Sequence, residues 1–155
     1  MTVKRYVYIA ASLLIAGQAL TRAHADVQIN PIVLKCPANS HVEGKAFPQG
    51  DAIVCRTSEG KLNGPFVTWH ENGNKKQTGS YSNDKPEGLF TEWNANGQIE
   101  SEGYLRSGEL NGFWVRWHPD GNKFSEGRWE KGVPAGTWTF WHESGAKKKE
   151  GYFKN

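Results

Sequence analysis

The sequence predicts an all-β fold, in which repeated β-hairpins form an antiparallel meander within a single-layer sheet. Two observations support this prediction. One pattern of glycine and aromatic residues returns every 24 residues from Gly64 to Asn155, and each unit divides into two short extended runs around a turn tetrad that contains glycine. A fixed period indicates a repeat architecture, and paired extended runs around such a turn indicate a hairpin. Longer links that contain Pro or Gly join the hairpins, which gives about eight strands.

Three glycines mark each unit. The first begins the unit, the second lies late in the turn, and the third lies in the second extended run. In this order they are Gly64, Gly88, Gly112 and Gly136; then Gly73, Gly97, Gly121 and Gly145; then Gly79, Gly103, Gly127 and Gly151. The second glycine stands where a left-handed residue commonly ends a turn. The third is expected to leave room for an aromatic ring.

Two rows of aromatic residues follow the same period. The front row is Phe66, Phe90, Trp114 and Trp138, and the tryptophan row is Trp69, Trp93, Trp117 and Trp141. Each front ring is expected opposite the third glycine of its own hairpin. Strict alternation puts Phe66 and Trp69 on opposite faces, so either both faces carry aromatic residues or a bulge turns one row around. Both rows are expected to be mainly core, and whatever part stays exposed is the candidate binding surface.

The first 25 residues have the layout of a secretory signal peptide. Lys4 and Arg5 precede an apolar run, and small residues follow it up to Ala25. The apolar run is shorter than the roughly 20 residues that a membrane-spanning helix needs. We expect a helical signal peptide at residues 1–25 that is cleaved before Asp26, and a mature protein in the periplasm or outside the cell.

Removal of this segment also changes the charge of the chain. It holds three of the 19 basic residues and no acidic residue, so 16 basic and 16 acidic residues remain. A balanced chain gives no electrostatic argument for nucleic acid, which needs a clustered basic surface. A mature chain of about 130 residues fits one domain and leaves no room for a separate enzyme module.

Cys36 and Cys55 would both meet an oxidising compartment, where a disulfide is the natural pairing. Zinc binding that includes His41 and free thiols are the alternatives, although the spacing is unusual for zinc. Residues 26–57 lack the glycine period and are expected to form an N-terminal arm and a disulfide-linked cap. Residues 58–155 are then the four repeats.

The recurring pattern G-x-[FW]-x-x-W-x-x-x-G-x-x-x-x-x-G over residues 58–155 resembles the MORN-repeat variant family. Similar proteins include bacterial exported proteins. The resemblance implies a sheet of hairpins and a scaffold that binds a protein or a lipid, without identifying the ligand. Some similar proteins are classed as antitoxins, although toxins of such pairs usually act in the cytoplasm and this chain begins with an export signal.

Two further columns of polar residues follow the repeat. His70, His118 and His142 share one position, which Asn94 interrupts, and Glu102, Glu126 and Glu150 share another. Equivalent residues lie two strands apart, roughly 10 Å, so a shared metal site is disfavoured. We expect polar residues that enter the turn and a solvated carboxylate column paired with lysines. No catalytic residues, metal or cofactor are predicted, and the chain is not expected to be an enzyme.

The leading functional hypothesis is therefore an exported, non-enzymatic scaffold that binds another protein at or beyond the cell envelope. An antitoxin or immunity-type protein is the alternative, and binding of lipid or cell-wall glycan through exposed aromatic residues is a further one. The last strand would be a sheet edge that Lys147, Lys148 and Lys149 guard against pairing. We therefore expect a monomer.

Overall fold

The computed structural model describes residues 34–154. The predicted signal peptide and most of the predicted arm, up to residue 33, lie outside the described residues, as does residue 155. Among the described residues, no helix is long and apolar enough to cross a membrane.

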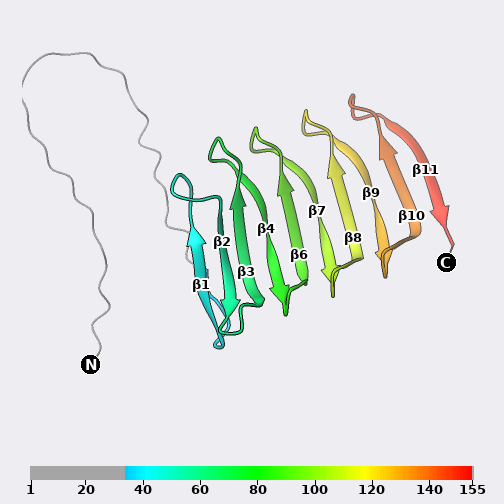
Figure 1. The fold of residues 1–155 in the computed structure, drawn as a ribbon. Coiled ribbons are helices and arrows are strands. Elements are labelled where there is room, and N and C mark those ends of the chain that lie inside the picture. Colours follow the sequence, from blue (N-terminus) through cyan, green and yellow to red (C-terminus); the bar gives the residue numbers. More distant parts are fainter. Residues whose placement is uncertain (1–33, 155) are drawn as a thin grey trace, which may run out of the picture. The chain divides into compact units, whose positions relative to one another are not determined.

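The described chain forms one antiparallel sheet, in which the strands lie side by side in chain order (Figure 1). The only strand off this path is the two-residue β5, which pairs with β4. The strands are β1 (Ser40–Lys45), β2 (Ala52–Thr57), β3 (Leu62–Trp69), β4 (Lys75–Ser82), β5 (Lys85–Pro86), β6 (Gly88–Trp93), β7 (Ile99–Arg106), β8 (Glu109–Trp117), β9 (Lys123–Glu130), β10 (Val133–Trp141) and β11 (Lys147–Phe153). The prediction of an all-β meander of hairpins is confirmed. The four predicted hairpins are β3–β4, β6–β7, β8–β9 and β10–β11.

The connections lie at the two ends of the strands (Figure 1). The four turns within the repeat hairpins lie at one end, and their late glycines have the expected positive φ, for example 87° at Gly73. The links between hairpins lie at the opposite ends of the strands, and two of the three are shorter than predicted, whereas residues 83–87 separate β4 from β6 as expected. Ser107 and Gly108, with φ of 52° and 90°, form a two-residue turn between β7 and β8. Two successive positive φ values match the twist of the flanking strands, so both strands continue up to the turn.

The predicted register between the front rings and the third glycines is confirmed. The pairs are Phe66–Gly79, Phe90–Gly103, Trp114–Gly127 and Trp138–Gly151. We call this side of the sheet the glycine face, and the opposite side, where alternation places the tryptophan row, the tryptophan face.

The sequence predicts that the ring of its own hairpin covers each third glycine, but the ring nearest to Gly79, Gly103 and Gly127 comes from the following hairpin. A Cβ atom built on Gly103 would lie 2.0 Å from Cε3 of Trp114, and one built on Gly127 would lie 2.2 Å from Cδ2 of Trp138. Real Cβ atoms do not approach other atoms so closely, so the missing side chain is required. Each of these glycines is thus a slot for the ring of the next hairpin, and this contact joins one hairpin to another.

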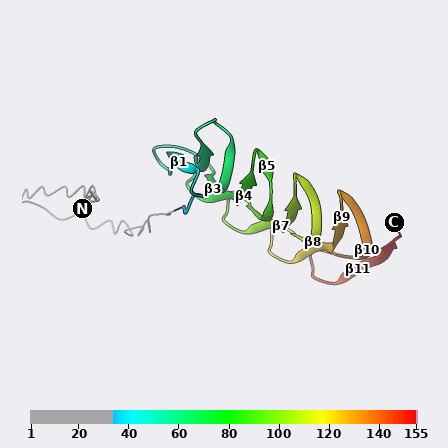
Figure 2. The same cartoon turned by 90° about the horizontal axis from the view of Figure 1, so that it is seen from below.

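The core is a series of ring contacts along the glycine face. Phe66, Phe90 and Trp138 are 4%, 9% and 6% exposed, although the sheet has one layer. The centroids of Phe66 and Phe90 lie 5.2 Å apart, and Trp129 meets Trp138 edge to face at 5.2 Å. Seen from below, the hairpins are bent and follow one another along the sheet (Figure 2). A stack of neighbouring units therefore buries what one hairpin cannot bury alone.

The cap is a hairpin of β1 and β2 that pairs with the first strand of the repeats, β3. The predicted disulfide joins Cys36 to Cys55, with Cα atoms 5.5 Å apart. Cys55 is 1% exposed, and a Cβ atom on Gly64 would lie 2.9 Å from the Cβ of Cys55. The disulfide is thus packed against the beginning of the first repeat.

Two of the three C-terminal lysines contact their own hairpin. Lys147 forms an ion pair with Glu150, and the Nζ atom of Lys149 lies 4.6 Å from the ring centroid of Phe140. Among the described strands, β11 pairs only with β10. We predict that changing Lys147, Lys148 and Lys149 together to Thr, which retains strand propensity and removes charge, makes the protein associate, as measured by light scattering at increasing concentration.

Lys123→Thr is a matched control, because Lys123 has the same repeat position as Lys147 and the same kind of ion pair, with Glu126, on the internal strand β9. It should stay monomeric. A triple variant that also remains monomeric at high concentration would disprove the guarding role.

Candidate functional site

The two aromatic rows proposed as a binding surface are largely used for packing. The front row lies in the core described above. In the tryptophan row, Trp69 is 9% exposed, and Trp93, Trp117 and Trp141 are half-buried. The Nζ atom of Lys75 lies 5.8 Å from the ring centroid of Trp93, and that of Lys123 lies 5.6 Å from Trp141. Residues of one hairpin therefore partly cover the tryptophan of the next hairpin.

The most exposed apolar side chains in the middle of the sheet belong to neither row. Leu89, Tyr104 and Phe113 are 45%, 52% and 54% exposed. Leu89 pairs with Tyr104 across β6 and β7, and a Cβ atom on Gly112 would lie 3.3 Å from the Cβ of Tyr104, which places β8 against the same residue. We call these three residues the apolar patch. Alternation puts Leu89 and Phe113 on the same face as Trp93 and Trp117.

Sequence reasoning missed this patch because its two repeat positions hold large apolar residues in only two of the four units each. The positions equivalent to Leu89 and Phe113 are Pro65 and Thr137, and those equivalent to Tyr104 are Ser80, Arg128 and Tyr152. The available signal was the large apolar residues Leu89 and Phe113 at one repeat position, which lie close to Tyr104 only once the strands pair.

The histidine column connects successive hairpin turns. Nε2 of His70 donates to the carbonyl oxygen of Trp93 at 2.8 Å, and Nε2 of His118 donates to that of Trp141 at 3.1 Å. A carbonyl oxygen can only accept, so the proton is on Nε2 in both rings. These two histidines are therefore inter-turn donors rather than converging ligands, which agrees with the prediction of polar residues that enter the turn.

Asparagine side chains add a second bond between the same pairs of turns. Nδ2 of Asn74 donates to the carbonyl oxygen of Ala95 at 2.8 Å, and Nδ2 of Asn122 donates to that of Glu143 at 2.7 Å. Nδ2 of Asn72 donates to the same oxygen of Ala95 at 2.6 Å. The first turn is thus joined to the second by one imidazole and two carboxamides, and the third turn to the fourth by one imidazole and one carboxamide.

The junction between the second and third turns lacks both bonds in the described structure. Asn94 replaces the histidine, and its Oδ1 accepts from the backbone amides of Asn96 and Gln98, at 3.0 and 3.1 Å, within its own turn. Gln98 replaces the asparagine, and its Nε2 lies near Gly121 without reaching a carbonyl of the third turn. Asn94, at the position that joins the turns elsewhere, therefore forms its hydrogen bonds within the second turn.

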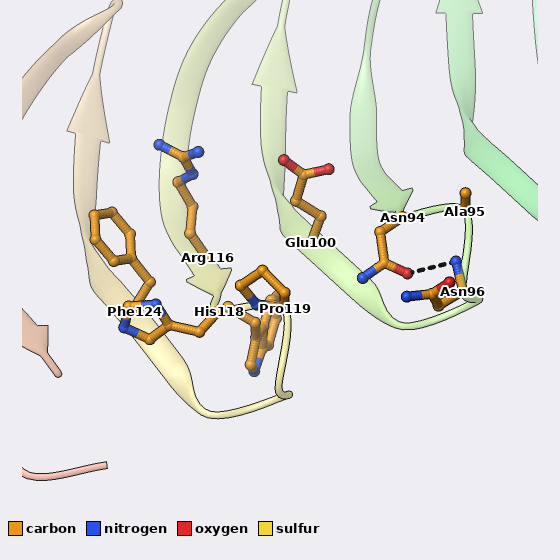
Figure 3. A pocket seen from close by; sticks show the side chains of 9 residues that line it. Asn94, Ala95, Asn96, Glu100, Arg116, His118, Pro119 and Phe124 are labelled. Carbon is orange, nitrogen blue, oxygen red and sulfur yellow. Dashed lines mark hydrogen bonds between the residues drawn. The ribbon is translucent and has the colours of Figure 1, made fainter. Parts of the chain in front are cut away.

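A cleft of about 530 Å³ opens at this junction (Figure 3). Asn94 and Asn96 line it from the second turn, and His118 and Pro119 from the third, while Glu100 and Arg116 reach it from β7 and β8. The guanidinium carbon of Arg116 lies 5.4 Å from the ring centroid of Phe124, and His118 meets the same ring edge to face at 5.1 Å. The cleft therefore combines a cation, a carboxylate and an aromatic wall.

A second cleft, of about 770 Å³, lies beside the first turn and is lined by Phe47 and Asp51 of the cap and by His70 and Lys76, among others. Here His70 already donates to Trp93.

The glutamate column has local partners. Glu102 accepts from Oγ1 of Thr91 at 3.0 Å, and Glu126 binds Nζ of Lys123 at 2.7 Å. The hydrogen bond and charge of Lys147 lower the pKa of the Glu150 carboxyl, which is exposed. Two of the three carboxylates are thus paired with lysines, as predicted. Among the described residues, no group of His, Cys, Asp and Glu is arranged to hold a metal ion.

Comparison with known families identifies the repeats. The model described as "MORN repeat variant" matches residues 62–83, 86–106 and 135–155, so the chain contains MORN repeats of this type. The intervening hairpin β8–β9 lies outside the matched segments but has the same register. The presence of these repeats indicates a repeat scaffold that binds a protein or a membrane. No curated protein matches the chain significantly.

One solved structure that resembles the chain is titled "Glycosylation Associate Protein (Gap123) complex from Streptococcus agalactiae", with a TM-score of 0.39 and 16% sequence identity. The match covers 69% of this chain and 20% of that chain, so this chain spans about a fifth of its length.

Proposed function

We propose that this chain, a protein built from MORN repeats of the variant type, is a non-enzymatic scaffold that holds another protein at the cell envelope or outside the cell. The observation that carries the proposal is the apolar patch of Leu89, Tyr104 and Phe113, each about half exposed at the centre of the sheet. An exposed cluster of large apolar side chains is typical of a protein-binding surface. The surface of the partner protein that covers this patch is therefore apolar at its centre.

The surroundings of the patch favour a protein partner over a membrane. Phe113 pairs with Arg128, whose Nε lies 3.3 Å from the carboxylate of Glu130, so the rim carries both signs of charge. An apolar centre with a polar, mixed-charge rim is the usual anatomy of a protein interface, whereas anionic lipid attracts a basic surface.

The export part of the proposal rests on the signal-like segment at residues 1–25 and on the disulfide. A disulfide between Cys36 and Cys55 persists in oxidising compartments such as the periplasm. The non-enzymatic part rests on the local bonds of His70, His118 and Glu126, which hold these side chains to neighbouring turns and to a lysine of the same strand.

We predict that changing Leu89, Tyr104 and Phe113 together to Ser reduces capture of the partner about tenfold or more, because central aromatic and aliphatic anchors carry most of the binding free energy. The measurement is quantitative pull-down from an envelope fraction with the tagged, exported protein. Unchanged thermal unfolding of the variant would show that the fold is intact.

The matched control changes Val133 and Tyr152 to Ser. These residues are 50% and 74% exposed and lie outside the patch. The control should capture the partner as the wild type does. Equal capture by the patch variant and the wild type would contradict the proposed function.

A further inference from the structure

We propose that the cleft between the second and third hairpin turns recognises a protein loop that inserts an imidazole or carboxamide side chain next to an acidic residue. This inference rests on the proposed function, since it describes part of the partner. The observation that carries it is the single interrupted junction in a row of turns that are otherwise joined by the chain's own imidazole and carboxamide groups.

The neighbouring junctions show which chemistry satisfies this position. At both of them an imidazole N–H binds the carbonyl oxygen of the next tryptophan, and a carboxamide N–H binds a carbonyl oxygen of the next turn. At the cleft, the equivalent acceptors are the carbonyl oxygens of Trp117 and Pro119, and neither receives a side-chain donor from the described residues. A ligand that supplies such donors completes the pattern that the rest of the chain repeats.

Arg116 determines the second part of the ligand. Its side chain is exposed, lines the cleft and forms no ion pair with the described acidic residues, including Glu100 beside it. A guanidinium binds a carboxylate through two parallel hydrogen bonds, which makes an acidic residue the fitting neighbour of the inserted side chain. Glu100 in turn accepts from a backbone N–H of the same loop. The cleft volume, about 530 Å³, is within the usual range for ligand pockets.

The repeat itself supplies a variant that closes the cleft. Asn94→His restores the residue of the other three units, so its imidazole should reach the carbonyl oxygen of Trp117 as His70 reaches that of Trp93. Asn96 can take over the bond from the backbone amide of Gln98, because Asn72 and Asp120 at the same repeat position already accept from the amides of Asn74 and Asn122. We therefore expect this variant to fold and to unfold at a higher temperature than the wild type.

The probe is the peptide acetyl-Ser-His-Asp-Ser-amide, added to the ¹⁵N-labelled exported protein and followed by NMR. We expect saturable shifts of the backbone amides of Asn96 and His118 and of the indole of Trp117. Binding should weaken at least tenfold in Asn94→His and at least fivefold in Arg116→Gln, which keeps a polar side chain and removes the guanidinium charge. Peptides with Leu in place of His, or Asn in place of Asp, should bind at least fivefold more weakly.

The outcomes separate this inference from the proposed function. The variant of Leu89, Tyr104 and Phe113 should bind the peptide as the wild type does. If that variant loses the protein partner while the wild type shows no saturable peptide binding, only the cleft assignment is overturned. Equal binding of the Leu peptide, unchanged binding by Asn94→His, or saturable binding of N-acetylglucosamine in place of the peptide would each overturn it as well. Peptide binding together with unaffected partner capture by the patch variant would instead overturn the proposed role of the patch.

Discussion

The Gly103→Ala variant should lose about 3 kcal/mol of unfolding free energy, which is the upper end of the usual loss when extra atoms are forced into a packed core. The added Cβ atom would lie 2.0 Å from Cε3 and 2.4 Å from Cδ2 of Trp114, and 2.9 Å from the carbonyl oxygen of Phe113. The indole is held against the strand, so relief requires a shift of backbone or of the whole ring. Chemical denaturation followed by tryptophan fluorescence measures the loss, and Gly127→Ala should behave alike.

The control is Gly151→Ala, at the same repeat position on β11. A Cβ atom there would meet no heavy atom within 4 Å, because no further hairpin among the described residues places a ring over it. Neither glycine has a positive φ, so backbone strain does not distinguish the two sites. We expect Gly151→Ala to be neutral. Equal destabilisation at both sites would show that the cost comes from losing glycine itself and not from ring stacking between hairpins.

Removal of the disulfide should cost about 3 kcal/mol, because the cross-link closes a loop of 19 residues and restricts the unfolded chain. Cys36→Ala measures mainly this effect, since Cys36 is half-buried. Cys55→Ala should cost more, because Cys55 is 1% exposed and its loss also leaves a cavity beside Gly64. Thermal unfolding of both variants, with and without reductant, provides the measurement.

Reductant should lower the melting temperature of the wild type and leave both variants unchanged. Equal stabilities of Cys36→Ala and Cys55→Ala would contradict the packing of Cys55 under the first repeat. A wild type that is insensitive to complete reduction would show that the cap does not depend on the cross-link.

The architecture could be predicted because the 24-residue period is strict and the glycine and aromatic positions constrain each other. The register of Phe66 with Gly79 followed from spacing alone. The expectation that the ring of its own hairpin covers each third glycine was only partly right, because the nearest ring comes from the following hairpin. A Cβ atom on Gly79 would lie 2.5 Å from the ring of Phe90 and 3.0 Å from that of Phe66. Both rings lie across a strand pair from Gly79, and both spacings are compatible with antiparallel pairing.

The candidate sites were harder to predict, for two different reasons. Leu89 and Phe113 share one repeat position and Tyr104 stands at another, but only two of the four units carry a large apolar residue at either position, so a search for features common to every unit passes over them. Asn94 was visible as an interruption of the histidine column. The effect of this interruption on the turns depends on whether a histidine side chain at this position reaches the next turn. Only the bond from His70 to Trp93 shows that this position joins two turns, and hence that Asn94 leaves them apart.

The slot that one hairpin offers to the ring of the next also bears on how such a chain evolves. A tandem duplication of 24 residues adds one hairpin that carries both a ring and a glycine slot. Its ring fills the slot of the preceding hairpin, and its slot receives the ring of the following one, so the number of units can change while every junction keeps the same contacts. Selection can then act on single positions within one copy. Asn94 is an example, because one side chain that differs from its counterparts gives one junction a cleft of its own.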